Sequence, residues 1–281
     1  MDNSQLVPLL LHMNGCATEE EMNANVTATI ERGYRPINEY LCPELGGRGY
    51  WSGTMSICGA APSLRDTYQE LQGAILTCNS ALGFLLDKGI VPNFAMIWDA
   101  SPLCEQFAIP HPDITYLLGA RCHHSVFKRL HGCKTIAWHA GGDHNIVEFL
   151  QQREIKEPLI NGGSAAVTRA LYLAFALGFR DLHLFGADSS YRDNDTHVNG
   201  SLVPEKDMTV WVGQHEGNKS FRTTPEFCAQ VEEFKSIYPH FLSMGCNIQV
   251  HGTGMLPHVY HLMKHSYAPL GGYNHVATTC V

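Results

Sequence analysis

The sequence lacks any hydrophobic run long enough to cross a bilayer, which argues against an integral membrane protein. The early apolar run from Leu6 to Leu11 is also too short for a signal peptide, and the residues before it carry no positive charge. We therefore expect a protein that stays in the cytoplasm and has no membrane partner.

An excess of positive charge is also missing. The chain has 19 Lys and Arg residues against 27 Asp and Glu residues, which gives a net charge of −8. Duplex DNA and anionic membranes are held mainly by basic surfaces, so bulk binding to nucleic acid is not expected. A local pocket could still bind one nucleotide.

Paired cysteine motifs and internal repeats are absent as well. The 281 residues include ten cysteines, but they are scattered, and none forms a C-x-x-C pair. Several, such as Cys58 and Cys78, fall in apolar segments that read as strands. This distribution favours buried free thiols in a reducing compartment over a disulfide framework.

What the chain does contain, from Thr54 onward, is an alternation of short apolar segments and helical patterns. The expected strands are 54–58, 74–79, 94–99, 114–118, 135–139, 182–185 and 247–250, and the expected helices are 62–71, 81–88, 124–130, 145–153, 164–177 and 225–243. Continuous apolar strands separated by helices are typical of a parallel sheet covered on both faces. The sequence thus predicts an α/β fold, a Rossmann-like, mostly parallel sheet with helices on both faces.

The domain organisation follows from the same pattern. Residues 1–53 are interpreted as an N-terminal lead-in with one helix at 19–32, and residues 54–266 as one domain. Within it, residues 189–222 form a polar loop excursion with a short hairpin near 209–212, and residues 267–281 form a tail. The excursion is either a binding loop or lid, or a disordered surface insertion.

Candidate site residues follow the first three expected strands. The turn from Gly59 through Ala61, Pro62 and Ser63 permits close approach of a ligand and begins a helix, where free N–H groups would bind phosphate. Asn79 ends the second strand and joins the candidate set. Asp99 follows the third strand, where it could bind a ribose hydroxyl or a metal ion. The alternative interpretations are an ordinary strand-to-helix turn and a helix cap.

Two further elements lie later in the chain. Gly162 and Gly163 precede Ser164, an expected helix cap, and would let the helix N-terminus approach a ligand. Gly186 and Asp188 follow a buried strand, with Tyr191 and His197 further along the loop. A histidine can act as general base toward a hydroxyl, and a nearby carboxylate would orient it and raise its basicity. A solvated surface histidine is the alternative. Loops after parallel strands gather at one edge, so we expect these elements to share one cleft.

In this order, the elements resemble the MptE-like family, whose name-giving members are archaeal 6-hydroxymethylpterin diphosphokinases. Its relatives include motility-associated flagellin glycosyltransferases, and its plan is similar to that of bacterial sialyltransferases. The matching segments are Ala61-Pro62-Ser63-Leu64, Asp99, Gly163-Ser164, Leu177-Gly178-Phe179, Gly186-Ala187-Asp188, Tyr191 and Thr196-His197. The resemblance covers residues 54–254. Ala61 replaces the usual glycine of the family, and its methyl group could crowd a phosphate.

The resemblance implies a transferase with a nucleotide-activated donor, with glycosyl transfer from a CMP-type sugar nucleotide to a hydroxyl as the leading reading. ATP-dependent pyrophosphoryl transfer to a 6-hydroxymethylpterin-like acceptor is one alternative, and it would need a cation such as Mg²⁺, with Asp99 and Asp188 as candidate ligands. A non-catalytic nucleotide-binding module is the other. The predicted catalytic residues are His197 and Asp188, and the predicted donor-binding residues are Gly59, Ala61, Pro62, Ser63, Asn79, Asp99, Gly162, Gly163, Ser164, Gly186 and Tyr191.

Overall fold

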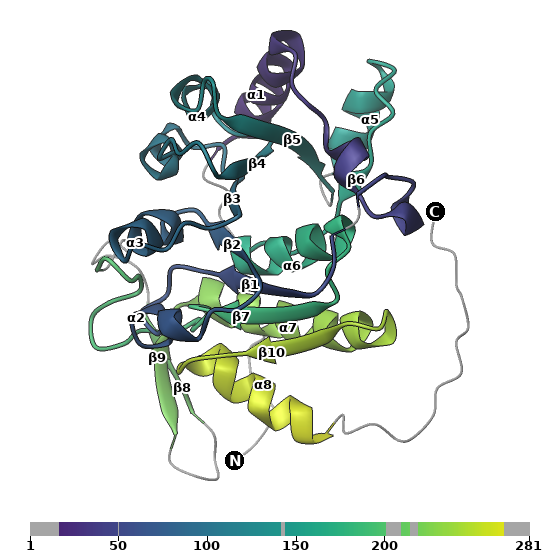
Figure 1. The fold of residues 1–281 in the computed structure, drawn as a ribbon. Helices are drawn as coiled ribbons and strands as arrows, with labels where there is room; N and C mark the ends of the chain where they lie inside the picture. The colour runs from purple at the N-terminus through teal and green to yellow at the C-terminus, as the bar shows by residue number, and fades with distance from the viewer. Residues whose placement is uncertain (1–16, 50, 142–143, 201–208, 214–218, 267–281) are drawn as a thin grey trace, which may run out of the picture.

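The computed structural model of this chain describes residues 17–49, 51–141, 144–200, 209–213 and 219–266. Its centre is an eight-stranded sheet in the order β10-β7-β1-β2-β3-β4-β5-β6, and all neighbouring strands are parallel (Figure 1). The strands are β1 (Thr54–Cys58), β2 (Ala74–Cys78), β3 (Phe94–Ile97), β4 (Thr115–Gly119), β5 (Lys134–Ala140), β6 (Leu159–Ile160), β7 (Asp181–Phe185) and β10 (Asn247–Val250).

The order of the strands places a topological switch point between β1 and β7. From β1 the chain adds β2 to β6 on one side, and then returns to add β7 and β10 on the other side. Crossover connections on the two sides of such a point leave a crevice outside the carboxyl ends of the strands, and ligands of open α/β sheets bind there.

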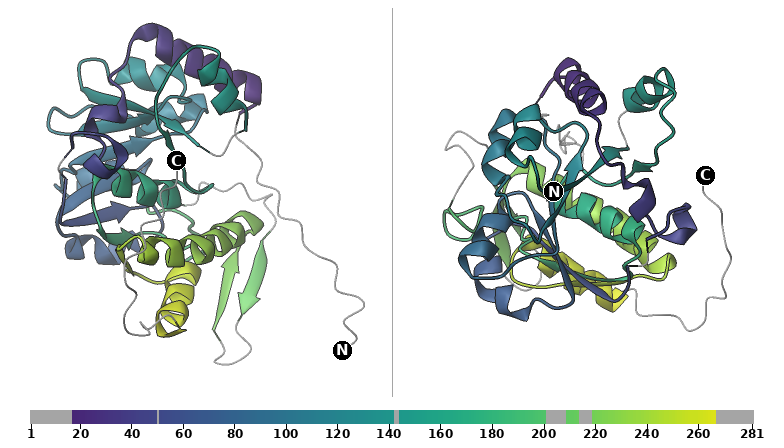
Figure 2. Two further views of the ribbon diagram at one scale, coloured as in Figure 1. Left: turned by 90° about the vertical axis from the view of Figure 1, so that its right-hand side faces the viewer. Right: turned by 45° about the horizontal axis from the view of Figure 1, so that its top comes forward.

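Helices cover both faces of the sheet, as Figures 1 and 2 show. Alternate residues of β3 demonstrate the two layers, because Phe94 and Met96 pack with α6, whereas Ala95 and Ile97 pack with α4. The helices are α1 (Glu19–Arg32), α2 (Leu64–Thr67), α3 (Ala81–Asp87), α4 (His124–Arg129), α5 (His144–Gln151), α6 (Ala166–Leu177), α7 (Pro225–Ser243) and α8 (Met255–Ser266). None of the helices in the described ranges combines the length and apolar character needed to span a bilayer.

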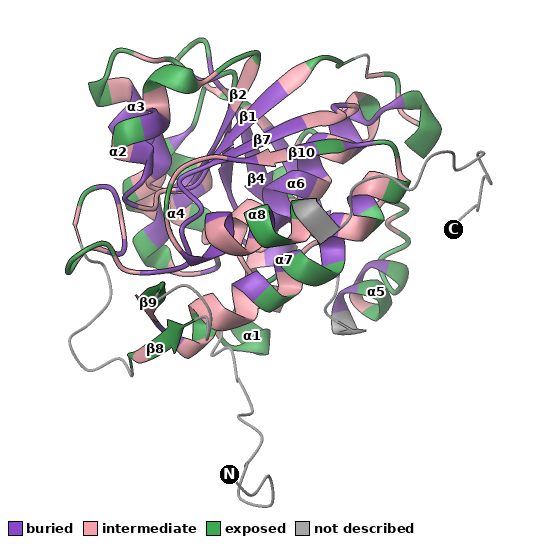
Figure 3. Cartoon of the chain, turned by 90° about the horizontal axis from the view of Figure 1, so that it is seen from below, coloured by how far each residue is buried: buried purple, intermediate pink, exposed green. Residues whose placement is uncertain are grey.

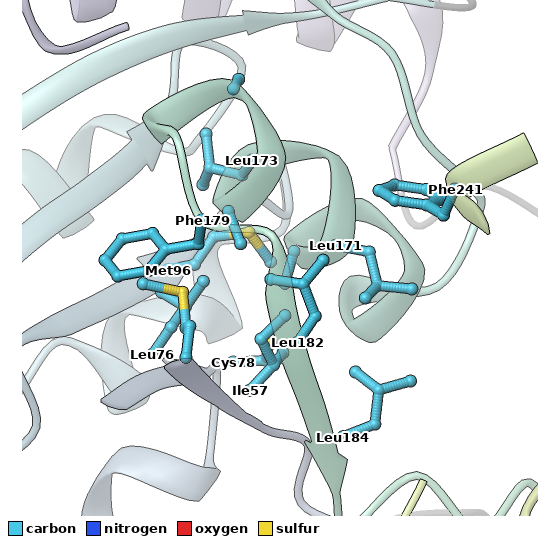
Figure 4. Packing of buried hydrophobic residues seen from close by; sticks show 14 of the residues in the cluster. Ile57, Leu76, Cys78, Met96, Leu171, Leu173, Phe179, Leu182, Leu184 and Phe241 are labelled. Atoms are coloured by element: carbon cyan, nitrogen blue, oxygen red, sulfur yellow. The ribbon is translucent and has the colours of Figure 1, made fainter. Parts of the chain in front are cut away.

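The largest core cluster lies between the sheet and the layer formed by α6 and α7 (Figure 4). Ile57, Leu182 and Leu184 point from β1 and β7 toward Leu171 of α6, and all four side chains are fully buried. Burying a side chain of this size contributes roughly 1.5–3 kcal/mol. In Figure 3, the strands β1 and β7 at the switch point and helix α6 are coloured largely as buried.

The structure confirms the predicted fold class, and most of the expected elements are present. The seven expected strands appear to within two residues at either end, whereas β6 was not expected because two residues are too few to produce a periodic pattern. The expected helix 62–71 is instead one turn of α-helix, α2, followed by the 3₁₀ turn Tyr68–Glu70. The expected hairpin near 209–212 corresponds to β8 (Val210–Gly213) and β9 (Ser220–Thr223).

The N-terminal segment is more closely built into the domain than its pattern indicated. Ile37 and Leu41 belong to the main core cluster, and the Ala137 N–H of β5 donates to the Arg35 carbonyl at 2.9 Å. Helix α1 begins with a capping box, in which Thr18 and Glu21 satisfy each other's backbone N–H groups. The expected tail, 267–281, lies outside the described residues.

The cysteines agree with the expectation of buried free thiols. All eight cysteines in the described part of the chain are free, and six of them are buried. Burial raises the pKa of the Cys58 and Cys78 thiols well above the ordinary value, so these thiols remain protonated and pack as small apolar groups.

Candidate functional site

A pocket of about 150 Å³ opens at the switch point, where the loops after β1, β2 and β7 meet the start of α6 and one face of α7. The predicted site residues that line it are Gly59, Ala61, Asn79, Gly186, Asp188 and His197. These residues come from loops that lie as far as 138 residues apart in the sequence (59 to 197). The fold therefore brings together three of the predicted loops and the predicted general base.

Two glycines let the β1 and β7 loops pass close to each other at the base of the pocket. A Cβ atom on Gly59 would collide with the Gly186 carbonyl oxygen, and a Cβ atom on Gly186 would collide with the Gly59 carbonyl oxygen. Gly186 also has a φ of 58°, which favours glycine. The need for glycine at both positions thus comes from the approach of one loop to the other.

Asp188 links these two loops directly. Its carboxylate accepts a hydrogen bond from the Ser63 N–H at 2.9 Å and a second one from the Ser63 hydroxyl. The side chain is almost fully buried, and this desolvation raises the pKa of Asp188 to about 6, despite the bonds from Ser63, which lower it. Asp188 therefore lies where it holds the pocket together.

The phosphate cradle expected after β1 depends on free N–H groups, but the chain itself uses three of them. The N–H of Gly59 donates to Phe185, that of Ala61 donates to Gly186, and that of Ser63 donates to Asp188. Helix α2 is only one turn long, so its dipole is small. Pro62 and Ser63 do not line the pocket. This loop forms one wall of the site, with most of its donors satisfied internally.

Two residues of the pocket wall have left-handed backbones without being glycine. Asn79 has a φ of 48° and Ser189 a φ of 49°, conformations that cost about 1–2 kcal/mol each. The Oδ1 atom of Asn79 is also buried and has no hydrogen-bond partner in the structure. A buried acceptor without a partner costs about 1–3 kcal/mol, and strain of this kind concentrates at functional sites. Asn79 thus combines backbone strain with an unused acceptor at the pocket wall, which makes it a candidate contact for a ligand.

His197 lines the same pocket from the far end of the loop after β7. Its Nδ1 lies 3.0 Å from the Thr196 hydroxyl, and Arg65 donates to its carbonyl oxygen at 3.2 Å. A carboxylate near the ring was expected, but Asp195, two positions before His197, pairs with Arg65 at 2.7 Å, so it holds the loop and not the ring. Burial lowers the pKa of His197, which leaves the imidazole neutral at pH 7. A neutral imidazole is the form that can accept a proton.

The loop excursion is anchored where it borders this site. Arg192 forms an ion pair with Asp66, and the Tyr191 N–H donates to the Arg222 carbonyl at 2.8 Å. Tyr191 itself lies against the Arg222 guanidinium, 4.5 Å from it, and does not line the pocket. Residues 189–200 are thus an ordered wall between α2 and the β8–β9 hairpin, and residues 201–208 lie outside the described chain.

The glycines before α6 accommodate the protein's own side chains. A Cβ atom on Gly162 would meet the Arg169 side chain at 2.9 Å, and one on Gly163 would collide with the Glu233 carboxylate. Glu233 accepts from the Ser164 N–H at 2.9 Å and from Thr168 Oγ1 at 3.0 Å. The helix is capped by Ala165 and not, as expected, by Ser164. An internal anion therefore occupies this helix start.

Asp99 also lies outside the pocket lining. Its Oδ1 accepts from the Ser101 N–H at 3.1 Å, and Ser101 caps the 3₁₀ helix that follows, Pro102–Phe107. The ring of the preceding residue, Trp98, contacts the Arg121 guanidinium at 4.2 Å and the Arg169 guanidinium at 4.6 Å. Arg169 is 5% exposed and donates to the Gly141 and Ile160 carbonyl groups. These contacts connect the ends of β3, β5 and β6 to α6.

The residues do not offer a prepared magnesium site. In the ranges that the structure describes, no three His, Cys, Asp or Glu side chains gather in a way that could hold a metal ion. Both Asp188 oxygens already accept from Ser63, and Asp99 does not share the pocket with it. The two carboxylates named as candidate ligands are therefore not brought around one cation.

Several pocket residues were not among the predicted ones. They are polar or aromatic side chains from α6, α7 and the loops: Ser80, Thr168, Ser189, Thr196, Phe227 and Gln230. Thr196 had appeared only as the neighbour of His197. Phe227 and Gln230 lie three residues apart on one face of α7, and this spacing does not distinguish a pocket wall from a core face.

Comparisons with known proteins agree with this fold. In solved structures, the chain is similar to the MAf glycosyltransferase from Magnetospirillum magneticum AMB-1, with 16% identity and a TM-score of 0.59. The match covers 84% of this chain but 37% of that one, so this chain spans little more than a third of its structural neighbour. No curated protein matches the sequence.

A family profile matches over more than half of the chain. It is described as "6-hydroxymethylpterin diphosphokinase MptE-like", and it covers residues 33–194. The matched range begins within the segment interpreted as a lead-in and ends in the loop after β7, so it contains the loops that form most of the pocket. The chain therefore belongs to the MptE-like family.

Proposed function

We propose that this protein is a transferase that binds a nucleotide-activated donor at the switch point and transfers a sugar to a hydroxyl group. One observation carries the proposal: a half-buried, neutral histidine, His197, lines the same pocket as the unpartnered acceptor Asn79 Oδ1. His197 can take the proton of the hydroxyl that attacks the sugar, and Asn79 Oδ1 can accept a hydrogen bond from an N–H or O–H group of the donor. Membership of a family named for a transferase supports the reaction class.

The charge of the pocket favours a donor with few phosphate groups. The lining contains no Lys or Arg in the described chain, and its charged group, Asp188, is an acid. A CMP-type sugar nucleotide has a single phosphate, whereas ATP has three and is normally bound with Mg²⁺ and basic side chains. The pocket volume of about 150 Å³ is below the usual range for small-molecule sites, so it would hold one part of the donor.

In the proposed reaction, His197 removes the proton from the acceptor hydroxyl as the oxygen attacks the sugar. The bond between the sugar and the phosphate then breaks, and the phosphate leaves with the bonding electrons. Asp188 keeps the β1 and β7 loops together through Ser63 during this step. The Ser189 hydroxyl donates to Gln230 Oε1 at 3.4 Å, and both side chains belong to the polar wall of the pocket.

Pyrophosphoryl transfer remains the second candidate, because the description of the matching family names a diphosphokinase. That reaction needs a cation to neutralise the triphosphate, and the described residues do not form a prepared site for one. If it occurs, the cation would have to arrive with the nucleotide.

A thermal-shift screen of CMP, CMP-sugars, UDP-sugars and ATP, each with and without Mg²⁺, tests the proposal. We expect CMP-type ligands to stabilise the fold without Mg²⁺, by about 2.7 kcal/mol at one hundred times the dissociation constant. Turnover of a CMP-sugar without a metal ion would support glycosyl transfer. Binding of ATP only, with strict dependence on Mg²⁺, would favour the diphosphokinase, and tight binding without any turnover would indicate a binding module.

A further inference from the structure

The β8–β9 hairpin projects from the body of the protein beside α7 and α8 (Figure 2). Trp211 and Arg222 are directly paired across its two strands, so their side chains lie on the same face. The opposite face packs toward the protein, where the Phe221 ring lies 5.4 Å from the His258 ring of α8. The face with Trp211 and Arg222 is therefore the outer one.

The hairpin adjoins the loop that forms part of the pocket wall. On the outer face, the Arg222 guanidinium lies 4.5 Å from the centre of the Tyr191 ring and donates to Asn194 Oδ1 at 3.1 Å. On the opposite face, the Thr223 hydroxyl donates to the Ser189 carbonyl at 2.9 Å. Ser189 lines the pocket, and the segment that begins there reaches His197. Three side chains, Trp211, Arg222 and Tyr191, thus form a row that leads from the rim of the site onto the hairpin. We call this row the hairpin platform.

The exposure and charge of the platform indicate what it binds. Trp211 is 71% exposed, an unusual position for a large aromatic residue. The hairpin sequence, 209–223, contains Lys219 and Arg222 against one acid, Glu216, although the whole chain has a net charge of −8. The Arg222 guanidinium offers donors to an anionic ligand, and guanidinium groups favour carboxylates.

The size of the platform distinguishes a small acceptor from a protein partner. A stable protein interface needs about 20–30 residues on each side, far more than three side chains. One or two sugar rings match this area, since the flat C–H face of a sugar can stack on an indole while its hydroxyls stay in water. Trp, Tyr and Arg are also the residues that contribute most to binding at small, well-defined contacts.

We propose that the hairpin platform binds the acceptor of the reaction, and that this acceptor is a carbohydrate carrying a carboxylate group. This inference rests on the proposed function for the identity of the site, but its binding step can be measured separately. The sugar ring would stack on Trp211, its carboxylate would pair with Arg222, and its reacting hydroxyl would extend past Tyr191 toward His197.

Two oligosaccharides serve as probes, 3′-sialyllactose with a carboxylate and lactose without one. Their binding to the full chain is measured by calorimetry, and donor binding and donor hydrolysis by water are measured on the same samples. We expect 3′-sialyllactose to bind at least tenfold more tightly than lactose. Trp211→Ala should weaken this binding at least tenfold, and Arg222→Gln should remove the preference for the carboxylate.

Val212→Ala is the matched control, because Val212 is 38% exposed on the other face of the same strand. It should leave both sugars bound as in the wild type, and all three variants should keep the wild-type donor affinity and hydrolysis rate. Unchanged sugar binding in Trp211→Ala would overturn the platform even if donor hydrolysis proceeds. If a decapeptide of glutamate binds and neither sugar does, the carbohydrate proposal is overturned in favour of a polypeptide acceptor. If the sugars bind but no donor does, the proposed function is overturned, whereas the platform is still supported as a sugar-binding surface.

Discussion

The carboxyl edge of the sheet has two regions that share residue types but differ in how their polar groups are used. After β1, β2 and β7, the loops carry strained residues, an unpartnered acceptor at Asn79 and a neutral histidine around a pocket. After β3 and β6, Asp99, Gly162 and Gly163 are engaged by Ser101, Arg169 and Glu233. Glycines and acids alone therefore do not mark a ligand site.

The largest expected effect is on the histidine of the first region. His197→Ala should lower the single-turnover rate of sugar transfer by about 10²–10⁴-fold, the usual range for loss of a general base. Donor affinity should change little, because the ring faces the acceptor. Since burial lowers the pKa of His197, the wild-type rate should hold as the pH falls to 6.5 and decline only below it. His131→Ala, at an exposed position, is the control, and equal rates in both variants would remove His197 from the mechanism.

The next effect concerns the link between the β1 and β7 loops. The pKa of Asp188 is about 6 in the folded protein and 3.8 in the ordinary case, so the folded state binds the extra proton between these values. The free energy of unfolding should therefore fall as the pH rises from 4 to 7, by about 3 kcal/mol from this group. Urea unfolding of Asp188→Asn should lack this fall. If the free energy of unfolding has the same pH dependence in the wild type and in Asp188→Asn, burial does not raise the pKa of Asp188.

A smaller effect is expected at Asn79, where stability and binding should move in opposite directions. Asn79→Gly relieves the left-handed backbone and removes the unpartnered acceptor, so it should raise the free energy of unfolding by about 1 kcal/mol. Loss of one hydrogen bond should weaken donor binding about tenfold.

Asp193→Gly is the matched control for this pair of measurements. Asp193 has a φ of 56° but lies exposed in a turn outside the pocket lining. It should raise the free energy of unfolding by a similar amount and leave donor affinity unchanged. Donor binding by Asn79→Gly as tight as that of the wild type would mean that the acceptor is not used by the ligand.

The smallest effect on binding is expected in the second region. Glu233→Ala removes the carboxylate that accepts from Ser164 and Thr168, and it should lower the free energy of unfolding by about 1–2 kcal/mol. Donor affinity, measured by calorimetry, should stay the same. If the start of α6 were the phosphate site, removal of this competing anion would instead strengthen donor binding, and that result would reverse the comparison between the two regions.

The sequence was sufficient to predict the sheet, because apolar runs such as Thr54–Cys58 and Phe94–Ile97 report burial on both faces. It was also sufficient to predict that Gly186, Asp188 and the β1 loop would meet. It did not reveal what each group would bond to. The Ser63–Asp188 and Arg65–Asp195 contacts join residues 125 and 130 positions apart, and local patterns contain no information on such pairs.

The difference between a free and an engaged residue was equally hidden. Asn79 and Asp99 both follow buried strands, yet only the first has a buried side-chain atom without a partner. Likewise, the glycines at 162–163 have the pattern of a ligand-binding helix start, but the space above them is filled by Arg169 and Glu233. These outcomes depend on the path of α7, which follows later in the chain.

A crystal structure of the protein soaked with CMP tests the central claim most directly, namely that the ligand binds at the switch point between β1 and β7. We expect the nucleotide in the pocket, with one of its N–H or O–H groups within hydrogen-bond distance of Asn79 Oδ1 and its phosphate side open to His197. Glu233 should remain on Ser164. A nucleotide bound on residues 162–164, with Glu233 displaced, or beside Asp99, would contradict the claim.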